Sequence, residues 1–70
     1  MSEAVSVVIN GELKQVPRGL NMPGLLAYLG ISTSRVAIER NLDILPQSLW
    51  DETQVSAGDR YEIVHLVGGG

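Results

Sequence analysis

The 70-residue sequence contains no cysteine. This absence excludes a disulfide framework and a thiolate zinc site, so a hydrophobic core must stabilise the small fold alone. The sequence also has no long apolar run near its start, where Met-Ser-Glu-Ala lacks basic residues and leads into only a few apolar positions. Such a segment is too short for a signal peptide or a membrane span. We therefore expect a cytoplasmic protein.

Clustered basic residues are missing too. Five scattered Lys and Arg residues stand against eight Asp and Glu, which gives a net charge of −3. A protein that binds a polyanion needs a continuous positive face that releases counterions. We therefore expect neither nucleic acid nor a membrane as a partner, and the acidic balance points instead to a basic protein partner.

The composition that remains is that of a globular domain. Apolar residues make up 44% of the chain and charged residues 19%, unlike the polar composition of disordered chains. A chain of this length has room for one core only, and no second domain can carry a separate active site. We predict a single domain over residues 1–67 and a glycine tail over residues 68–70.

The first segment alternates apolar and other residues with a period of two. Val5, Val7 and Ile9 share one face of a strand predicted over residues 4–9. Asn10-Gly11 is the strongest two-residue hairpin signal. The chain should therefore turn back into a second strand over residues 12–16, which Pro17 ends.

A helix is predicted next, with Asn21 as its N-cap and Gly30 at its end. Pro23 is tolerable in the first turn. Apolar residues recur at i, i+3, i+4 and i+7, so one face of the helix is expected to be buried. The residues of this stripe are Met22, Leu25, Leu26 and Leu29.

The alternation returns over residues 35–40, where Val36 and Ile38 should face inward on a third strand. A turn begins at Asn41. The apolar but proline-containing stretch that follows predicts a short strand and then an irregular or 3₁₀ turn. We expect this turn to pack Leu49 and Trp50 on the core.

The last predicted strand covers residues 60–67, after a turn at residues 56–59. Its apolar residues occupy both faces, which is typical of a central strand. The predicted order is thus two strands, a helix, two strands and a final strand. This order predicts an α+β fold in which the helix is a crossover packed on one face of the sheet.

Three consecutive glycines, Gly68, Gly69 and Gly70, follow this strand, although no core or turn requires them. Terminal fraying is one interpretation. The other is functional, because a tail without side chains can enter a narrow channel and deliver a carboxylate to another protein's active site. At about 3.3 Å per extended residue, residues 67–70 would reach about 13 Å from the sheet.

The sequence resembles the ubiquitin-like β-grasp sulfur carriers, and within them the ThiS family. The resemblance covers nearly the whole chain and is most specific at Val36 to Asn41 (VAIERN) and at Tyr61 to Gly70 (YEIVHLVGGG). It implies a ubiquitin-like β-grasp: a mixed sheet packed on one helix, with the first and last strands adjacent and parallel. It also implies a flexible C-terminal glycine tail.

The same resemblance implies a function for the tail. A ThiF-like adenylyltransferase would use ATP to join the Gly70 carboxylate to AMP, after Gly68 and Gly69 have threaded into its active site. A cysteine desulfurase or another persulfide donor would then displace AMP and leave a thiocarboxylate. A ThiG-like thiazole synthase would accept the sulfur for the thiazole of thiamin. The carrier itself would bind no cofactor and catalyse nothing.

The other polar residues are given structural roles. His65 has neither a second ligand nor a nucleophile at workable spacing. Glu39, Arg40 and Asn41 are typical of a solvated strand end or a local ion pair. We predict no metal site, and we expect exposed apolar residues of the sheet, Leu66 among them, to contact partners. Four scattered carboxylates are assigned to solubility and turns: Asp43, Asp51, Glu52 and Asp59.

Three alternatives remain open. The chain also resembles the small subunit of molybdopterin synthase, a related sulfur carrier that has a proline-rich approach to its final glycines where this sequence has Ile63 to Val67. A non-covalent β-grasp interaction module would use no carboxylate chemistry. A minimal hydrolase would need a nucleophile beside a base, and one histidine without cysteine gives it little support.

Overall fold

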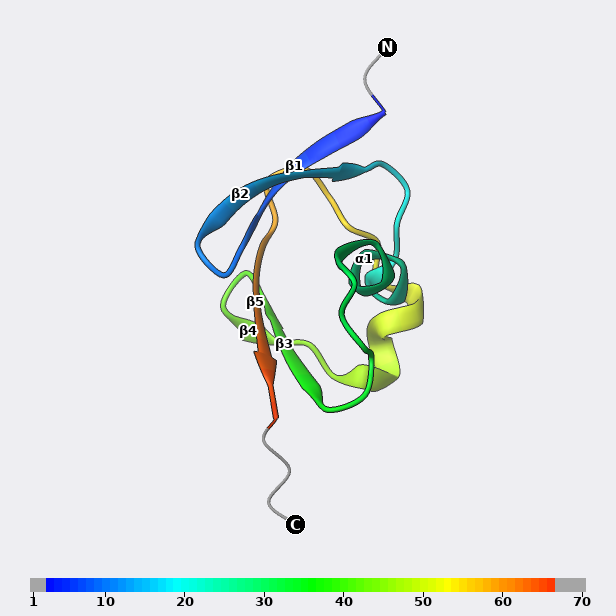
Figure 1. Cartoon of the computed structure of the whole chain (residues 1–70), viewed down its shortest axis with the longest axis vertical. Helices are drawn as coiled ribbons and strands as arrows, with labels where there is room; N and C mark the ends of the chain where they lie inside the picture. Colours follow the sequence, from blue (N-terminus) through cyan, green and yellow to red (C-terminus); the bar gives the residue numbers. More distant parts are fainter. Residues whose placement is uncertain (1–2, 67–70) are drawn as a thin grey trace.

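The computed structural model describes residues 3–66. They form a five-stranded mixed sheet with the strand order β2-β1-β5-β3-β4, and α1 and η1 both pack on one side of it (Figure 1). This confirms the predicted α+β architecture. The elements are β1 (Ala4–Ile9), β2 (Glu12–Pro17), α1 (Met22–Leu29), β3 (Val36–Arg40), β4 (Asp43–Ile44), the 3₁₀ helix η1 (Gln47–Glu52) and β5 (Arg60–His65).

The β1–β2 hairpin follows the sequence pattern closely. Asn10 and Gly11 adopt positive φ angles of 51° and 83°, the conformation that a tight two-residue hairpin requires. The antiparallel register runs from Ile9 opposite Glu12 to Ala4 opposite Pro17. β2 is thus one residue longer than predicted, because it lies at the sheet edge, where a proline need not donate to a neighbour.

Helix α1 begins and ends where the sequence predicts. The Asn21 side chain accepts a hydrogen bond from the Gly24 amide at 2.9 Å, and Gly30 ends the helix with a φ of 75°. A Cβ at Gly24 would lie 3.1 Å from the Asn21 side-chain oxygen, so glycine leaves room for this cap. Within the predicted stripe Met22, Leu25 and Leu26 are fully buried, whereas Leu29 is partly exposed.

Strand β3 starts at Val36 rather than at Arg35, because Arg35 has a φ of 63° that no strand accommodates. The turn predicted at Asn41 joins β3 to the short edge strand β4, with Asn41 and Leu42 both at positive φ. Val36 and Ile38 face the core as expected.

The 3₁₀ helix η1 separates two residues that were expected to pack together. Trp50 is 3% exposed, and its indole nitrogen donates to the Leu45 carbonyl at 3.0 Å. Leu49 is 43% exposed, so its predicted packing on the core is wrong. Successive residues of a 3₁₀ helix point about 120° apart, and one of these two neighbours must therefore face away from the sheet.

Strand β5 lies at the centre of the sheet, as predicted. It pairs in parallel with β1 through Val8–Arg60 and Ile9–Tyr61 and antiparallel with β3 from Tyr61 to His65, which confirms the arrangement that the resemblance implied. The face towards α1 forms the core. The buried residues of this core, from the sheet, α1, η1 and the segment after η1, are Val5, Val7, Ile9, Val16, Met22, Leu25, Leu26, Val36, Ile38, Trp50, Val55, Tyr61 and Ile63.

Candidate functional site

The predicted modified residue Gly70 and the tail residues Gly68 and Gly69 lie outside the described residues. Their roles stay predictions. What the structure does describe is the strand that leads to them, since β5 runs from the centre of the molecule to one end of the sheet (Figure 1). The site is therefore built from what fixes β5 and from what surrounds its end.

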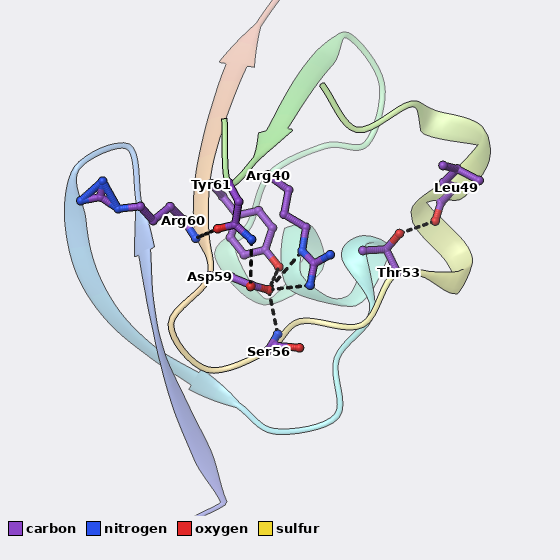
Figure 2. Close-up of polar contacts among 8 residues, drawn as sticks. Arg40, Leu49, Thr53, Ser56, Asp59, Arg60 and Tyr61 are labelled. Atoms are coloured by element: carbon purple, nitrogen blue, oxygen red, sulfur yellow. Dashed lines mark hydrogen bonds and ion pairs between the residues drawn. The ribbon is translucent and has the colours of Figure 1, made fainter. Parts of the chain in front are cut away.

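The start of β5 is fixed by a buried carboxylate, Asp59, which is only 6% exposed. Figure 2 shows the side chains converging on it: Tyr61 donates its hydroxyl at 2.7 Å and Arg40 donates Nη2 at 3.1 Å. The Ser56 amide donates at 2.9 Å and the Asn41 side chain at 3.4 Å. One carboxylate thus joins the end of β3, the turn and the first residues of β5.

The hydrogen bonds determine the charge states in this cluster. Burial by itself raises the pKa of the Asp59 carboxyl, but the bonds it accepts, from Tyr61 and the Ser56 amide above all, keep that pKa below its ordinary value. Burial raises the pKa of the Tyr61 hydroxyl well above its ordinary value. The hydrogen bond that this hydroxyl donates to Asp59, and the negative charge of Asp59, raise it further. Asp59 is therefore a stable anion at neutral pH, and its role is to anchor the strand.

The predictions for these residues had mixed outcomes. Assigning Asp59 to solubility is wrong, because it is buried and accepts hydrogen bonds from four residues. Its predicted turn role is confirmed, since its backbone amide and its carboxylate both bond Ser56 across the turn. Extending the period-two alternation of Ile63 and Tyr61 backwards would have placed Asp59 on the buried face. Of the two alternatives for Arg40, a solvated strand end or a local ion pair, the structure shows an ion pair, but with the distant Asp59, 3.1 Å away.

The middle of β5 is held by a side chain. Asn10 donates Nδ2 to the Ile63 carbonyl at 3.2 Å and accepts from the Ile63 amide at 2.7 Å. The Asn10 backbone amide also donates to the Tyr61 carbonyl at 2.9 Å. A side-chain amide thereby continues the β1–β5 ladder for two residues beyond the point where β1 turns away.

The end of β5 is much more open. Val64 and Leu66 are 54% and 52% exposed, and His65 is exposed as well. The Leu66 amide donates to the Arg35 carbonyl at 2.7 Å, which fixes the last described residue to the chain before β3. Leu66 is thus accessible, as a partner contact requires, although its predicted role stays a prediction.

The side of the sheet opposite α1, which we call the outer face, extends from this open end across all five strands. Neither α1 nor η1 covers it (Figure 1), and Leu13, Ile44 and Val64 are largely exposed on it. The residues of the outer face are Ala4, Ser6, Val8, Leu13, Gln15, Pro17, Ala37, Glu39, Ile44, Arg60, Glu62 and Val64.

The described residues offer little for chemistry of their own. Within residues 3–66 no three His, Asp or Glu side chains gather as metal ligands would, and α1 and η1 are too short to cross a bilayer. A shallow pocket of about 70 Å³ lies on the outer face, whereas small-molecule sites measure about 300–1,000 Å³.

Comparison with known proteins agrees with this architecture. The sequence matches the ThiS family over residues 7–70. The chain belongs to the ThiS family. It is also similar to a crystal structure of the thiamine biosynthesis protein ThiS from Geobacter metallireducens, with 30% identity and a TM-score of 0.81 over 94% of this chain and 100% of that one. The fold is therefore the ThiS β-grasp.

Other relatives extend the ThiS-family comparison. A solution structure of a thiamine biosynthesis protein from the same organism has a TM-score of 0.75 at 30% identity, over 94% of this chain and 88% of that chain. A protein named thiazole synthase from Paramagnetospirillum magneticum is 41% identical over 94% of this chain, which spans only 20% of that relative. The uncharacterised protein ycf40 of Porphyra purpurea is 37% identical over 100% of this chain and 99% of its own length.

Proposed function

We propose that this chain is a sulfur carrier of thiamin biosynthesis, whose Gly70 carboxylate is adenylated and then converted to a thiocarboxylate. The observation that carries the proposal is the family match, which runs from residue 7 through the three glycines to residue 70. The open end of β5 supports it, because a tail that enters another protein must leave the body where nothing covers the strand.

The chemistry needs an activating enzyme. A carboxylate anion is a poor electrophile, so an adenylyltransferase joins it to the α-phosphate of ATP and releases pyrophosphate. A persulfide sulfur then attacks the acyl carbon, AMP leaves with the bonding electron pair, and cleavage of the sulfur–sulfur bond by a thiol leaves the thiocarboxylate on Gly70. In this proposal the carrier is a protein co-substrate in the cytoplasm, and ATP is bound by its partner.

The proposed acceptor of the sulfur is a thiazole synthase. Relatives from Paramagnetospirillum magneticum and Magnetococcus marinus bear that name, and each aligns with 94% of this chain across 20% of its own length. A carrier-like segment inside a protein of that name supports a functional connection between the two. The proposed docking surface on the carrier includes the outer face and Leu66.

Intact-mass measurement tests the proposal directly. The purified chain is incubated with the adenylyltransferase of its own organism, ATP and a persulfide donor, and a gain equal to one oxygen replaced by sulfur is expected. Deleting Gly70 or adding one alanine after it should abolish the gain while the fold survives. An unchanged wild-type mass with an active partner would support the non-covalent interaction module instead.

The related carrier of molybdopterin synthesis needs a separate test. The thiocarboxylated chain is offered to the thiazole synthase and to the molybdopterin synthase large subunit of the same organism. We expect sulfur transfer with the first only. Transfer to the second alone would reject the thiamin assignment while leaving the carrier chemistry intact.

A further inference from the structure

Two glutamates face each other at the centre of the outer face. Glu39 of β3 and Glu62 of β5 are direct cross-strand partners, and both side chains are exposed. Their neighbours Ile38 and Ile63 form the next pair along the same strands and point into the core. The two carboxylates must therefore project together from the side of the sheet that no helix covers.

This arrangement is unfavourable in the isolated chain. Like charges directly opposite each other on a sheet destabilise the strand pair. Within residues 3–66 the ion pairs are Lys14–Glu12 and Arg40–Asp59, so neither Glu39 nor Glu62 forms a direct ion pair. Arg60 lines the same shallow pocket but forms no ion pair with either glutamate, and Figure 2 shows its side chain extending away from the Asp59 cluster.

Apart from Arg60, which lines the same shallow pocket, the cross-strand neighbours of the pair are apolar. Ile44 lies opposite Glu39 on β4, and Ala37 and Val64 form the next outward pair. Exposed apolar side chains around a small charged centre are typical of a protein interface, in which an apolar region excludes water from a specific polar contact. A surface on which exposed apolar side chains border two carboxylates suits a protein that presents a basic side chain.

We propose that the enzyme that activates the tail places an arginine or lysine side chain between Glu39 and Glu62, with apolar residues of that enzyme covering Ile44 and Val64. A guanidinium can bond both carboxylates and so relieve their repulsion. The proposal rests on the proposed function, because it names the contact by which that enzyme recognises the carrier.

A second copy of this chain is a poor occupant. Two outer faces in contact would bring four carboxylates together, and each chain carries a net charge of −3. Repulsion of this kind raises the free energy of the wrong complex, which is how an interface excludes unwanted partners. The pair therefore selects for a basic partner and against self-association.

The test compares binding with stability. The adenylyltransferase of the same organism is titrated with wild type, Glu39→Gln, Glu62→Gln and the double variant, and Glu52→Gln on η1 is the matched control. We expect each single change to weaken binding several-fold and the double change about tenfold or more, with a shallower salt dependence. The thermal midpoint of the free double variant should equal or exceed that of wild type, and Glu52→Gln should bind like wild type.

Several outcomes would overturn this proposal. Wild-type affinity in the double variant would do so, and so would a loss of binding that follows a lowered thermal midpoint, since that indicates a structural role. A carrier dimer in sedimentation that the double variant strengthens would assign the face to self-association. If wild type is converted to the thiocarboxylate while the variants bind normally, only the docking proposal fails; if the enzyme neither binds nor converts wild type, the proposed function fails with it.

Discussion

The two ends of β5 are built differently. At its start, Asp59 is buried and joins three segments through hydrogen bonds from four residues. At its end, Val64 and Leu66 are about half exposed, and the Leu66 amide bonds only to the Arg35 carbonyl. The same strand is thus anchored firmly at one end and left accessible at the other.

The two ends of β5 thus differ in role: its start anchors the strand, and its end is the part accessible to a partner. The hydrogen bonds that anchor β5 are concentrated at its buried start, whereas Val64 and Leu66 at the accessible end are not part of the core. Substitutions near the end of β5 should therefore alter recognition without unfolding the domain. The predictions below test this division, beginning with the change expected to have the largest effect on stability.

Asp59→Ala should destabilise the domain most. The change removes the acceptor of the Tyr61 hydroxyl and leaves Arg40 unpaired in a partly buried position. Removing one partner of a buried ion pair costs about 3–5 kcal/mol, which is a large share of the stability of so small a domain. Urea denaturation measures the loss, and Asp51→Ala on the exposed side of η1 is the control. A loss below 1 kcal/mol would show that the start of β5 is not the main anchor.

The same cluster should limit stability in acid. Because the pKa of Asp59 is lower in the folded chain than its ordinary value, its contribution is complete above the unfolded pKa of about 4 and is lost as the pH falls through the folded pKa. Thermal midpoints between pH 7 and pH 2 should therefore fall less steeply for Asp59→Asn than for wild type. Parallel curves for the two proteins would contradict this assignment.

Asn10→Gly should have an intermediate effect. Glycine keeps the positive φ of the hairpin but removes both side-chain hydrogen bonds to Ile63. We expect a loss of about 1 kcal/mol in chemical denaturation. Asn10→Asp keeps the acceptor for the Ile63 amide and should fall between glycine and wild type, whereas equal stability of all three would show that the ladder does not need this side chain.

Leu66→Ala should have the smallest effect on stability, within about 0.5 kcal/mol, because its side chain is half exposed and lies beyond the strand. Binding to the proposed adenylyltransferase should nevertheless weaken. Calorimetric titration measures the binding, with Leu49→Ala on η1, away from the outer face, as the comparison. A stability loss as large as that of Asp59→Ala would remove the distinction between the two ends.

Much of the fold could be predicted from the sequence, because local chemistry and tertiary packing agree there. The hairpin at Asn10-Gly11, the cap at Asn21 and the helix end at Gly30 are each specified by one or two residues. The central place of β5 followed from its apolar composition, and its parallel pairing with β1 from the family resemblance. These features need little knowledge of distant contacts.

The features that sequence reasoning missed depend on contacts between distant segments. Asp59 looks like an ordinary turn residue until Arg40, far away in the sequence, is placed beside it. The opposition of Glu39 and Glu62 requires the β3–β5 register, which no short motif specifies. Leu49 was misplaced because apolar character alone does not say which side of a 3₁₀ turn faces the core.

The central position of β5 has a consequence for the synthesis of the chain. Without β5 the strand order leaves a β1–β2 hairpin and a β3–β4 hairpin with nothing between them, and isolated hairpins are at best marginally stable. A nascent or truncated chain that stops before Arg60 should therefore stay unfolded and open to proteolysis. The fold can therefore be completed only after β5 has been synthesised.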